Sequence, residues 1–290
     1  MAGNRIIYLN GSFVSEQKAR ISPFDRGLLL ADGLFETMKA YCGKVFKLAD
    51  HWQRLQHGAD LLKIQVTISQ QTLQDISQQL LAKNHLLNQQ AILRLTITRG
   101  VGPRGLLPPQ KISTSVLLTT FPCPEQNDGV SVLVTSHFPK NEFSPLAQIK
   151  TLNYLENILA KIEAVTKGFS DALLVNSKNY LIQASAANLF IVDSKQQLLT
   201  PPISDGVLPG ITRRTVLDLA KQLSLPCFEK SLLLTDLAAA KEVFLTNSIV
   251  EIQPVMQVNN QYPLDINNNP ITRKLQSGYQ NHTLNLKSAD

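Results

Sequence analysis

The chain has 290 residues, of which 43% are hydrophobic and 17% are charged, and its formal net charge at pH 7 is +6. This length and composition are typical of one large or two ordinary globular domains, and they exclude disordered, collagen-like and coiled-coil proteins. Because the sequence has no apolar run of roughly 20 residues and no secretory signal, we expect no membrane segment and a cytoplasmic location. Lys and Arg are scattered along the chain, so the charge favours anionic small molecules over nucleic acid.

Strands and helices alternate in the first half of the chain. Apolar or alternating runs predict strands, and apolar residues that recur every three or four positions predict helices. Ser69 has the side chain of a helix N-cap residue. The predicted order is strands at 6–9, 33–41 and 45–48, helices at 50–64 and 69–83, and strands at 91–98 and 114–121.

A segment dense in turn formers, PCPEQNDG at 122–129, interrupts this pattern and predicts a linker. Beyond it we expect strands at 130–136, 172–175, 189–192 and 243–245, and helices at 154–166, 212–223 and 271–279. The fold class is therefore α/β (α+β) with two lobes. The predicted domains are a small N-terminal α/β domain at 1–122, a linker at 123–129 and a larger C-terminal domain at 130–290.

Most standard catalytic motifs are absent from the sequence. It contains no GxGxxG, GxxxxGK[ST], GxSxG or HExxH pattern, and its five histidines have no metal-ligand spacing, so we expect no metal site. We expect the histidines to be structural or solvated. The three cysteines are far apart and odd in number, which indicates reduced thiols.

Two turns have the features of an anion site. Ile211 and Thr212 open a predicted helix after Pro-Gly, where free backbone N–H groups can bind a phosphate. Asn247 and Ser248 follow an apolar strand and offer further donors. Arg54 on the first helix could supply a positive charge, although an arginine there is also compatible with a surface role.

Lys150 lies in a largely apolar stretch that opens a predicted helix. Desolvation there would favour a neutral amine, which can form a Schiff base. The alternative is a lysine whose stem is buried and whose charge reaches the surface. The residues themselves leave both interpretations open.

Seven segments, in this order, resemble the fold-type IV pyridoxal-phosphate (PLP) enzymes, and the resemblance covers nearly the whole chain. The family includes branched-chain and D-amino-acid aminotransferases and 4-amino-4-deoxychorismate lyases. The segments are SPFDRG (22–27), ADGLFET (31–37), HWQRL (51–55), IKTLNYLENILAKIEA (149–164), SAANLF (185–190), LPGITRR (208–214) and EVFLTNSIVEIQPV (242–255).

The resemblance implies a role for each matching residue. It makes Lys150 the lysine that binds PLP covalently and places Tyr154 near the cofactor's 3′-oxygen. It assigns the cofactor phosphate to Arg54, Ile211, Thr212, Asn247 and Ser248. It further implies a PLP-binding C-terminal lobe with a barrel-like sheet, and a homodimer with its sites near the interface.

One position departs from the family pattern. The usual segment is Glu-x-Ser-x-Ser-Asn, whose glutamate pairs with the pyridine nitrogen of PLP, whereas this chain has Gln183 there. A neutral glutamine supplies no compensating negative charge, so we expect a weaker electron sink.

Among family members, the chain resembles the lyases most, through RGVGPRG (99–105) and TNSIVEIQP (246–254). We therefore expect conversion of 4-amino-4-deoxychorismate to 4-aminobenzoate and pyruvate, a step in folate synthesis. The resemblance suggests that Thr37 protonates the leaving group, unless it only packs by its methyl group, and that Phe35 and Arg104 contact the anionic substrate. The alternative is an aminotransferase of branched-chain or D-amino acids.

Overall fold

The computed structural model describes residues 5–110, 113–125 and 127–287, which form two compact units. Unit 1 takes in residues 1–124, 149–153 and 283–290, and unit 2 takes in residues 125–148 and 154–282. The chain passes between the units within the linker predicted at 123–129, of which residue 126 lies outside the described residues. The sequence did not predict that residues 149–153 return to unit 1, since a short segment that pairs with a distant strand leaves no mark in local composition.

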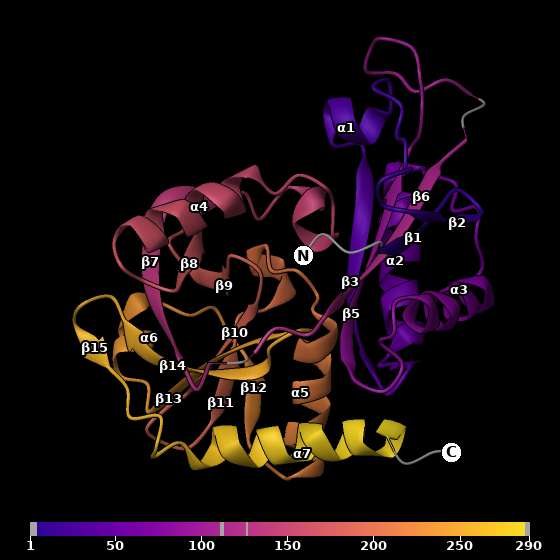
Figure 1. Cartoon of the computed structure of the whole chain (residues 1–290). Helices are drawn as coiled ribbons and strands as arrows, with labels where there is room; N and C mark the ends of the chain where they lie inside the picture. The colour runs from indigo at the N-terminus through magenta and orange to yellow at the C-terminus, as the bar shows by residue number, and fades with distance from the viewer. Residues whose placement is uncertain (1–4, 111–112, 126, 288–290) are drawn as a thin grey trace. The chain divides into compact units, whose positions relative to one another are not determined.

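Unit 1 is built on an antiparallel sheet with the strand order β2-β1-β6-β5-β3-β4 (Figure 1). Helices α2 (Leu48–Leu62) and α3 (Gln70–Lys83) pack on one face of this sheet, and the short helix α1 (Arg26–Leu30) precedes β3. The strands are β1 (Ile6–Leu9), β2 (Ser12–Ser15), β3 (Gly33–Tyr41), β4 (Lys44–Val45), β5 (Gln90–Thr98) and β6 (Ser115–Pro122).

Alternation along the two long strands defines the core of unit 1. Leu34 and Met38 of β3 and Leu93 and Leu95 of β5 are buried in one cluster with the apolar faces of α2 and α3. Successive side chains on a strand point to opposite faces, so Phe35 and Thr37 point to the face opposite this core. One face of β3 therefore stabilises the fold, while the other carries residues assigned to the active site.

Unit 2 contains a closed ring of strands in the order β10-β13-β14-β7-β8-β9, with β9 pairing back to β10. The β14–β7 and β7–β8 pairs are parallel and the other pairs are antiparallel, so the ring is a mixed barrel. This confirms the predicted α/β fold with a barrel-like C-terminal sheet. Its strands are β7 (Val130–Lys140), β8 (Asp171–Asn176), β9 (Leu181–Ala184), β10 (Asn188–Val192), β13 (Glu242–Asn247) and β14 (Glu251–Val258).

Shorter elements surround the barrel. Strand β11 (Leu198–Thr200) pairs with β10, β12 (Cys227–Glu229) pairs with β11, and β15 (Tyr262–Pro263) pairs with β14. Helix α4 packs outside β7 and β8, and α5 packs outside β13 (Figure 1). The helical elements are η1 (Pro145–Gln148), α4 (Leu155–Thr166), η2 (Ile203–Asp205), α5 (Ile211–Gln222), α6 (Leu234–Ala238) and α7 (Pro270–Lys287).

Strand β8 is apolar on both faces because it has a core on each side. Leu173 and Val175 point into the barrel core. Ala172 and Leu174 point outwards, into a second cluster that includes Ala160 of α4. A strand that is buried on both faces shows a continuous apolar run rather than alternation, as this sequence does.

A buried carboxylate ties α7 to the barrel. Glu242 accepts hydrogen bonds from the backbone N–H groups of Ile271 (3.0 Å) and Thr272 (2.7 Å), and from the Thr272 hydroxyl (2.7 Å). The first N–H groups of a helix lack intrahelical partners, so a carboxylate placed there stabilises the helix start. Helix α7 starts one residue before the helix predicted at 271–279 and extends beyond its end, to Lys287.

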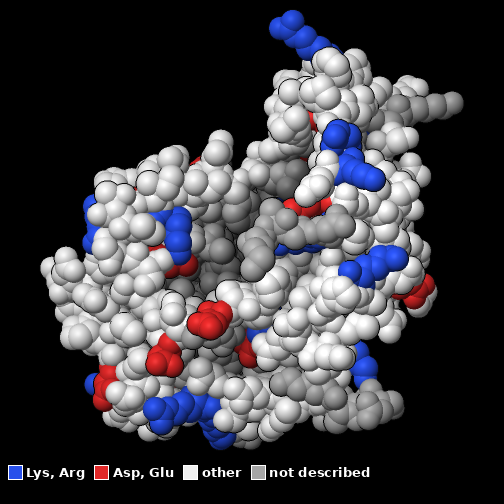
Figure 2. All heavy atoms as spheres, viewed as in Figure 1, with Lys and Arg blue, Asp and Glu red and all other residues white. Residues whose placement is uncertain are grey.

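The surface charge agrees with the scattered pattern of the sequence. On the face in Figure 2, Lys and Arg side chains occur in small separate groups interspersed with Asp and Glu. None of the helices described is long and apolar enough to cross a membrane. Among the described residues, no group of three or more His, Cys, Asp or Glu side chains could hold a metal ion.

Candidate active site

Lys150 lies in a short segment that is hydrogen-bonded to strand β3 within unit 1. The Phe35 N–H donates to the Lys150 carbonyl (3.0 Å), and the Leu152 N–H donates to the Gly33 carbonyl (3.1 Å). Ile149 anchors the segment because it is buried in the unit 1 core. The backbone of Lys150 is thus fixed to a central strand.

The aromatic ring of Phe35 lies beneath two cations. The Lys150 Nζ is 4.3 Å from the ring centroid, and the Arg94 Cζ is 3.8 Å from the same centroid. The electron-rich face of an aromatic ring attracts cations, so Phe35 helps to position both side chains. Thr37 shares this face of β3 and is paired in register with Arg94. The structure therefore brings Phe35, Thr37 and Lys150 to one region of unit 1 and adds Arg94, which the sequence did not single out.

Glu36, on the opposite face of β3, forms a buried polar cluster with two residues of α2. Its carboxylate accepts from Arg54 Nε (2.8 Å) and Nη2 (2.6 Å), and it lies 2.7 Å from His51 Nδ1. Burial favours protonation of Glu36, but the charge and hydrogen bonds of Arg54, aided by His51, outweigh it and lower the Glu36 pKa to about 2. The Glu36 carboxylate is therefore ionised at neutral pH.

His51 takes a structural role in this cluster, one of the two expected from the sequence. Burial lowers the His51 pKa against the opposing effect of Glu36, and the charges of Arg54 and Lys150 add to the lowering. A neutral imidazole with a proton on Nδ1 donates to the Glu36 carboxylate. The role of Arg54 as a phosphate ligand stays a prediction.

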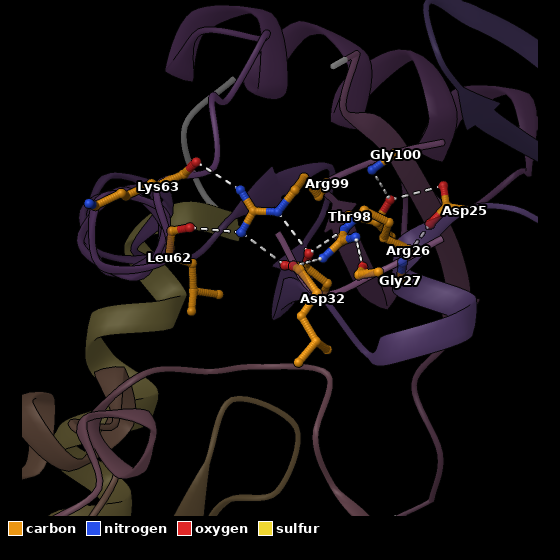
Figure 3. A network of polar contacts seen from close by, with 11 residues as sticks. Asp25, Arg26, Gly27, Asp32, Leu62, Lys63, Thr98, Arg99 and Gly100 are labelled. Carbon is orange, nitrogen blue, oxygen red and sulfur yellow. Dashed lines mark hydrogen bonds and ion pairs between the residues drawn. The ribbon is translucent and has the colours of Figure 1, made fainter. Parts of the chain in front are cut away.

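Asp32 holds two arginines in unit 1 (Figure 3). It accepts from Arg26 Nε (2.8 Å) and from Arg99 Nε (2.7 Å) and Nη2 (3.0 Å). Partial burial raises the pKa of Asp32, but the hydrogen bonds and charges of Arg99 and Arg26 outweigh this and lower it overall. Arg99 also donates to the carbonyls of Leu62 (2.8 Å) and Lys63 (2.9 Å) at the end of α2, where helix carbonyls lack intrahelical partners.

The loop that carries Arg104 is fixed by this network. Arg26 donates from Nη1 to the Gly105 carbonyl and from Nη2 to the Leu106 carbonyl, both at 2.8 Å. Arg104 is exposed in this loop. Its predicted contact with substrate stays a prediction, while the structure shows that the backbone beside it is held in place.

Three segments of unit 2 meet at one end of the barrel. The Leu208 N–H donates to Gln183 Oε1 (2.9 Å), and the Leu208 carbonyl accepts from Asn188 Nδ2 (2.9 Å). Asn247 Nδ2 donates to the Ala186 carbonyl (3.1 Å). Side-chain hydrogen bonds therefore join three segments: the β9–β10 hairpin, the loop before α5 and the turn after β13. Gln183, Ile211, Thr212, Asn247 and Ser248 all lie in or beside these segments.

The start of α5 has the properties of a phosphate site. Its N-cap residue, Gly210, has no side chain to bind the first N–H groups of the helix. A Cβ atom at Gly210 would lie 1.9 Å from Asn188 Oδ1, so only glycine permits this close approach. Within the described part of the chain, the buried Thr246 Oγ1 has no hydrogen-bond partner. Open N–H groups and an unpaired hydroxyl fit an anionic group such as the PLP phosphate.

The turn after β13 is shaped by Asn247 itself. Its Oδ1 accepts from the N–H groups of Ile249 (2.8 Å) and Val250 (2.9 Å). Ser248 lies within this turn. Tyr154 is the N-cap residue of α4, also in unit 2. The cofactor roles of Asn247, Ser248 and Tyr154 stay predictions.

Sequence reasoning missed three polar residues near these groups. Arg94 is the single charged residue of strand β5, Glu36 is one of two charged residues in the largely apolar strand β3, and Thr246 is a threonine in strand β13. A charged residue inside a largely apolar strand can be recognised from the sequence alone. It indicates a buried polar contact, because the charge must find a partner when the strand is buried. For Thr246, no signal separates it from an ordinary strand residue.

Comparison with known proteins identifies relatives along nearly the whole chain. A family model described as amino-transferase class IV matches residues 33–258. A provisionally named branched-chain-amino-acid aminotransferase of Methanocaldococcus jannaschii is 36% identical over 278 residues, covering 94% of this chain and 95% of that protein. A D-alanine aminotransferase of Staphylococcus epidermidis is 27% identical, covering 95% of this chain and 97% of that protein.

Solved structures show the same architecture. The Escherichia coli branched-chain amino acid aminotransferase superposes with a TM-score of 0.90 at 27% identity, covering 96% of this chain and 94% of that chain. A Legionella pneumophila protein provisionally named 4-amino-4-deoxychorismate lyase superposes with a TM-score of 0.84 at 30% identity, covering 92% of this chain and 97% of that chain.

Proposed function

Since this chain belongs to the class IV aminotransferase family, whose members use PLP, we propose that it transfers the amino group of a small amino acid to a 2-oxo acid. The relatives above that are named as branched-chain and D-alanine aminotransferases support this proposal. The aminotransferase, which the sequence offers as the alternative, thus replaces the lyase as the leading interpretation. We further propose a branched-chain or other apolar amino acid as the substrate.

The observation that carries this choice is the position of Phe35 beneath Lys150. With its Nζ 4.3 Å from the ring centroid, the amine that takes part in the reaction lies against an apolar surface. An aliphatic substrate side chain is well accommodated by such a surface. Arg94, on the same ring, would bind a substrate carboxylate near that amine.

The residues assigned to the cofactor have distinct tasks. When bound, PLP accepts the amino group and withdraws electrons from the Cα–H bond of the amino acid. We propose that the Lys150 amine takes the proton from Cα of the donor amino acid as a general base, and that in the second half-reaction it would give a proton to Cα of the newly formed amino acid as a general acid. The N–H groups of Ile211 and Thr212, with Asn247, Ser248 and Arg54, would hold the phosphate.

In the proposed assignment Gln183 faces the pyridine nitrogen of PLP, where it would set how strongly the cofactor withdraws electrons. Its Oε1 is engaged by the Leu208 N–H, so the part of the side chain left to face the cofactor is the Nε2 donor group. An N–H donor suits an unprotonated pyridine nitrogen. We therefore expect slower proton removal from Cα than in a family member that has glutamate at this position.

The test is a half-reaction assay with single substrates. Protein loaded with PLP is mixed separately with L-leucine, L-valine and D-alanine, and the 2-oxo acid and pyridoxamine phosphate are quantified. We expect L-leucine or L-valine to react faster than D-alanine. Lys150→Ala should abolish the reaction, and Lys161→Ala, which removes a half-exposed lysine of α4, should leave it unchanged. No 2-oxo acid from any of the three substrates would refute the proposal.

The lyase remains a second candidate because of one specific observation. The Legionella pneumophila protein named for that reaction is 30% identical over 92% of this chain. In this reaction the product ring becomes aromatic, which eases the demand on the electron sink and suits Gln183. Incubation with 4-amino-4-deoxychorismate separates the candidates, since release of 4-aminobenzoate and pyruvate without amino-group transfer would establish the lyase and exclude the aminotransferase.

A further inference from the structure

Unit 2 contains a pocket whose lining residues are different from those assigned to the cofactor. Its volume is about 390 Å³, which lies within the range of small-molecule sites. Its walls come from residues 127–128, from β14 and the residue before it at 250–254, from the loop at 266–269 and from the first turns of α7. The pairing of β14 with β7 and the contact of Glu242 with the start of α7 hold these walls in place.

Asn269, in the wall of this pocket, is a buried residue whose side chain lacks its usual partners. It directly precedes α7 and is only 5% exposed. An asparagine at this position normally accepts from N–H groups of the first helical turn, but here those of Ile271 and Thr272 donate to Glu242. The Asn269 Oδ1 is therefore buried without a hydrogen-bond partner among the described residues. Because an unpaired buried acceptor is costly, a ligand that supplies a donor is favoured at this wall.

The pocket is lined by one acidic and one basic side chain, Asp128 and Arg273, both of which are exposed. A guanidinium group binds a carboxylate through two parallel hydrogen bonds, and a carboxylate binds an ammonium group. A zwitterion carries both of these groups and matches both charges at once. A phosphate would be repelled by Asp128, and a metal ion would be repelled by Arg273.

The rest of the lining contains both polar and apolar surface. Gln276 is held by a hydrogen bond from its Nε2 to the Ile252 carbonyl (2.9 Å), and its amide adds to the polar part of the wall. The apolar part comes from Val250, Ile252, Pro254 and Ile266. Mostly apolar walls with a few placed polar groups are typical of sites for small organic molecules, and here they accommodate an aliphatic side chain.

We propose that this pocket binds a free amino acid with an apolar side chain, at a site separate from the one assigned to the cofactor. The carboxylate of the ligand binds Arg273. Its ammonium group binds Asp128 and donates to the Asn269 Oδ1, which gains the partner that it lacks in the helix. The side chain of the ligand contacts Val250 and Ile266. This inference does not depend on the reaction that the protein catalyses.

The first test measures binding of radiolabelled L-leucine by equilibrium dialysis, with holoenzyme whose cofactor has been fixed to the protein by borohydride reduction. Leucine cannot react with the reduced cofactor, so dialysis reports non-covalent binding. We expect saturable binding that Arg273→Met and Asn269→Leu each weaken at least ~10-fold, as for loss of a charge-assisted hydrogen bond. The matched control is Lys274→Met, which removes an exposed charge of α7 outside the pocket and should leave binding unchanged. Far-ultraviolet circular dichroism verifies that each variant is folded.

The second test separates the two charged ends of the ligand. Leucinamide lacks the carboxylate and 4-methylpentanoate lacks the ammonium group, so each should bind the parent at least ~10-fold more weakly than L-leucine. Arg273→Met should leave the affinity for leucinamide unchanged, and Asp128→Asn should leave the affinity for 4-methylpentanoate unchanged. Each variant removes only the group that the matching analogue does not use, and both replaced residues are exposed, so this test stands even where Asn269→Leu does not fold.

Three results would overturn the proposal. The first is a parent protein that shows no saturable binding of L-leucine. The second is binding of L-leucine that Arg273→Met leaves unchanged, or that Lys274→Met weakens equally, since the ligand would then lie elsewhere. The third is an affinity for leucinamide and 4-methylpentanoate equal to that for L-leucine, which would mean that the two charges of the pocket do not contact the ligand.

Discussion

Replacing Glu36 with glutamine tests how much the buried cluster of Glu36, Arg54 and His51 stabilises unit 1. Glutamine keeps the size of the side chain and removes its charge. Arg54, whose side chain is only 9% exposed, then loses the anion that pairs with it. Removal of one partner from a buried ion pair is strongly destabilising because the other charge stays buried without compensation.

The pKa of Glu36 sets the magnitude. A shift from the ordinary value of 4.5 to about 2 corresponds to about 3 kcal/mol of stability supplied by the ionised form. Since the pKa is lower in the folded state, this stability is fully present above pH 4.5 and is lost as the pH falls towards 2. We therefore expect Glu36→Gln to cost about 3 kcal/mol at pH 7, and the gap between parent and variant to narrow below pH 4.5 because a protonated Glu36 is neutral like glutamine.

The assay is urea unfolding followed by the fluorescence of Trp52, the single tryptophan of the chain, which packs against the unit 1 core. The free energy of unfolding is measured for both proteins at pH 7 and again near pH 3. Glu16→Gln serves as the control, since the side chain of Glu16 is about a third exposed and pairs with Arg5 at 3.6 Å, so its loss should change stability by less than about 1 kcal/mol. A gap of the same size at both pH values would refute the view that ionisation of Glu36 is the source of this stability.

Three further predictions concern the cofactor and its chemistry. Lys150→Ala should lower turnover at least ~10³-fold, and borohydride reduction of the parent should place the cofactor mass on Lys150 in peptide mapping; a label on another lysine would refute its assignment. Gly210→Ala should weaken PLP binding by about 1–3 kcal/mol in a fluorescence titration, because the added Cβ displaces the start of α5 from Asn188; unchanged affinity would exclude this helix start as a ligand. Gln183→Glu should increase half-transamination of amino acids more than lyase turnover, and a variant that loses both activities would contradict our account of the electron sink.

The sequence predicts those elements whose pattern is local. Strands β1 and β3 have the predicted bounds, and Ser69 caps α3 by accepting from the Thr72 N–H (3.0 Å). Strand β14 was missed because Pro254 interrupts it, and the structure accommodates this proline beside a bulge between Val255 and Gln257. Strands β9, β11 and β12 are too short to show a period. Closure of the barrel by β9 and β10 is a non-local pairing and has no signature in a single sequence.

The same distinction holds for the candidate site. A helix start with Pro-Gly and a turn after a strand are local features, and both point to the unit 2 segments that the structure brings together. The hydrogen bonds that attach Lys150 to β3 join residues more than 100 positions apart, and the pairing of Glu36 with Arg54 depends on how α2 packs on the sheet. Sequence therefore predicts which residue types can do the chemistry, while the partners that orient them come from tertiary packing.

The closed ring of unit 2 also limits the ways in which this protein can aggregate. Unpaired strand edges are templates for intermolecular β-sheet, and a ring of six strands has none. The outermost strands described are short: β12 has three residues and β15 has two in unit 2, and β2 has four and β4 has two in unit 1. Of the two nine-residue strands, β5 pairs on both sides, while β3 pairs with β5 along its length and on its other side with β4 at Ala40 and Tyr41 and with Thr151 at Leu34. A chain rich in buried strands is in this way protected from edge-to-edge association, chiefly by the shortness of its edge strands.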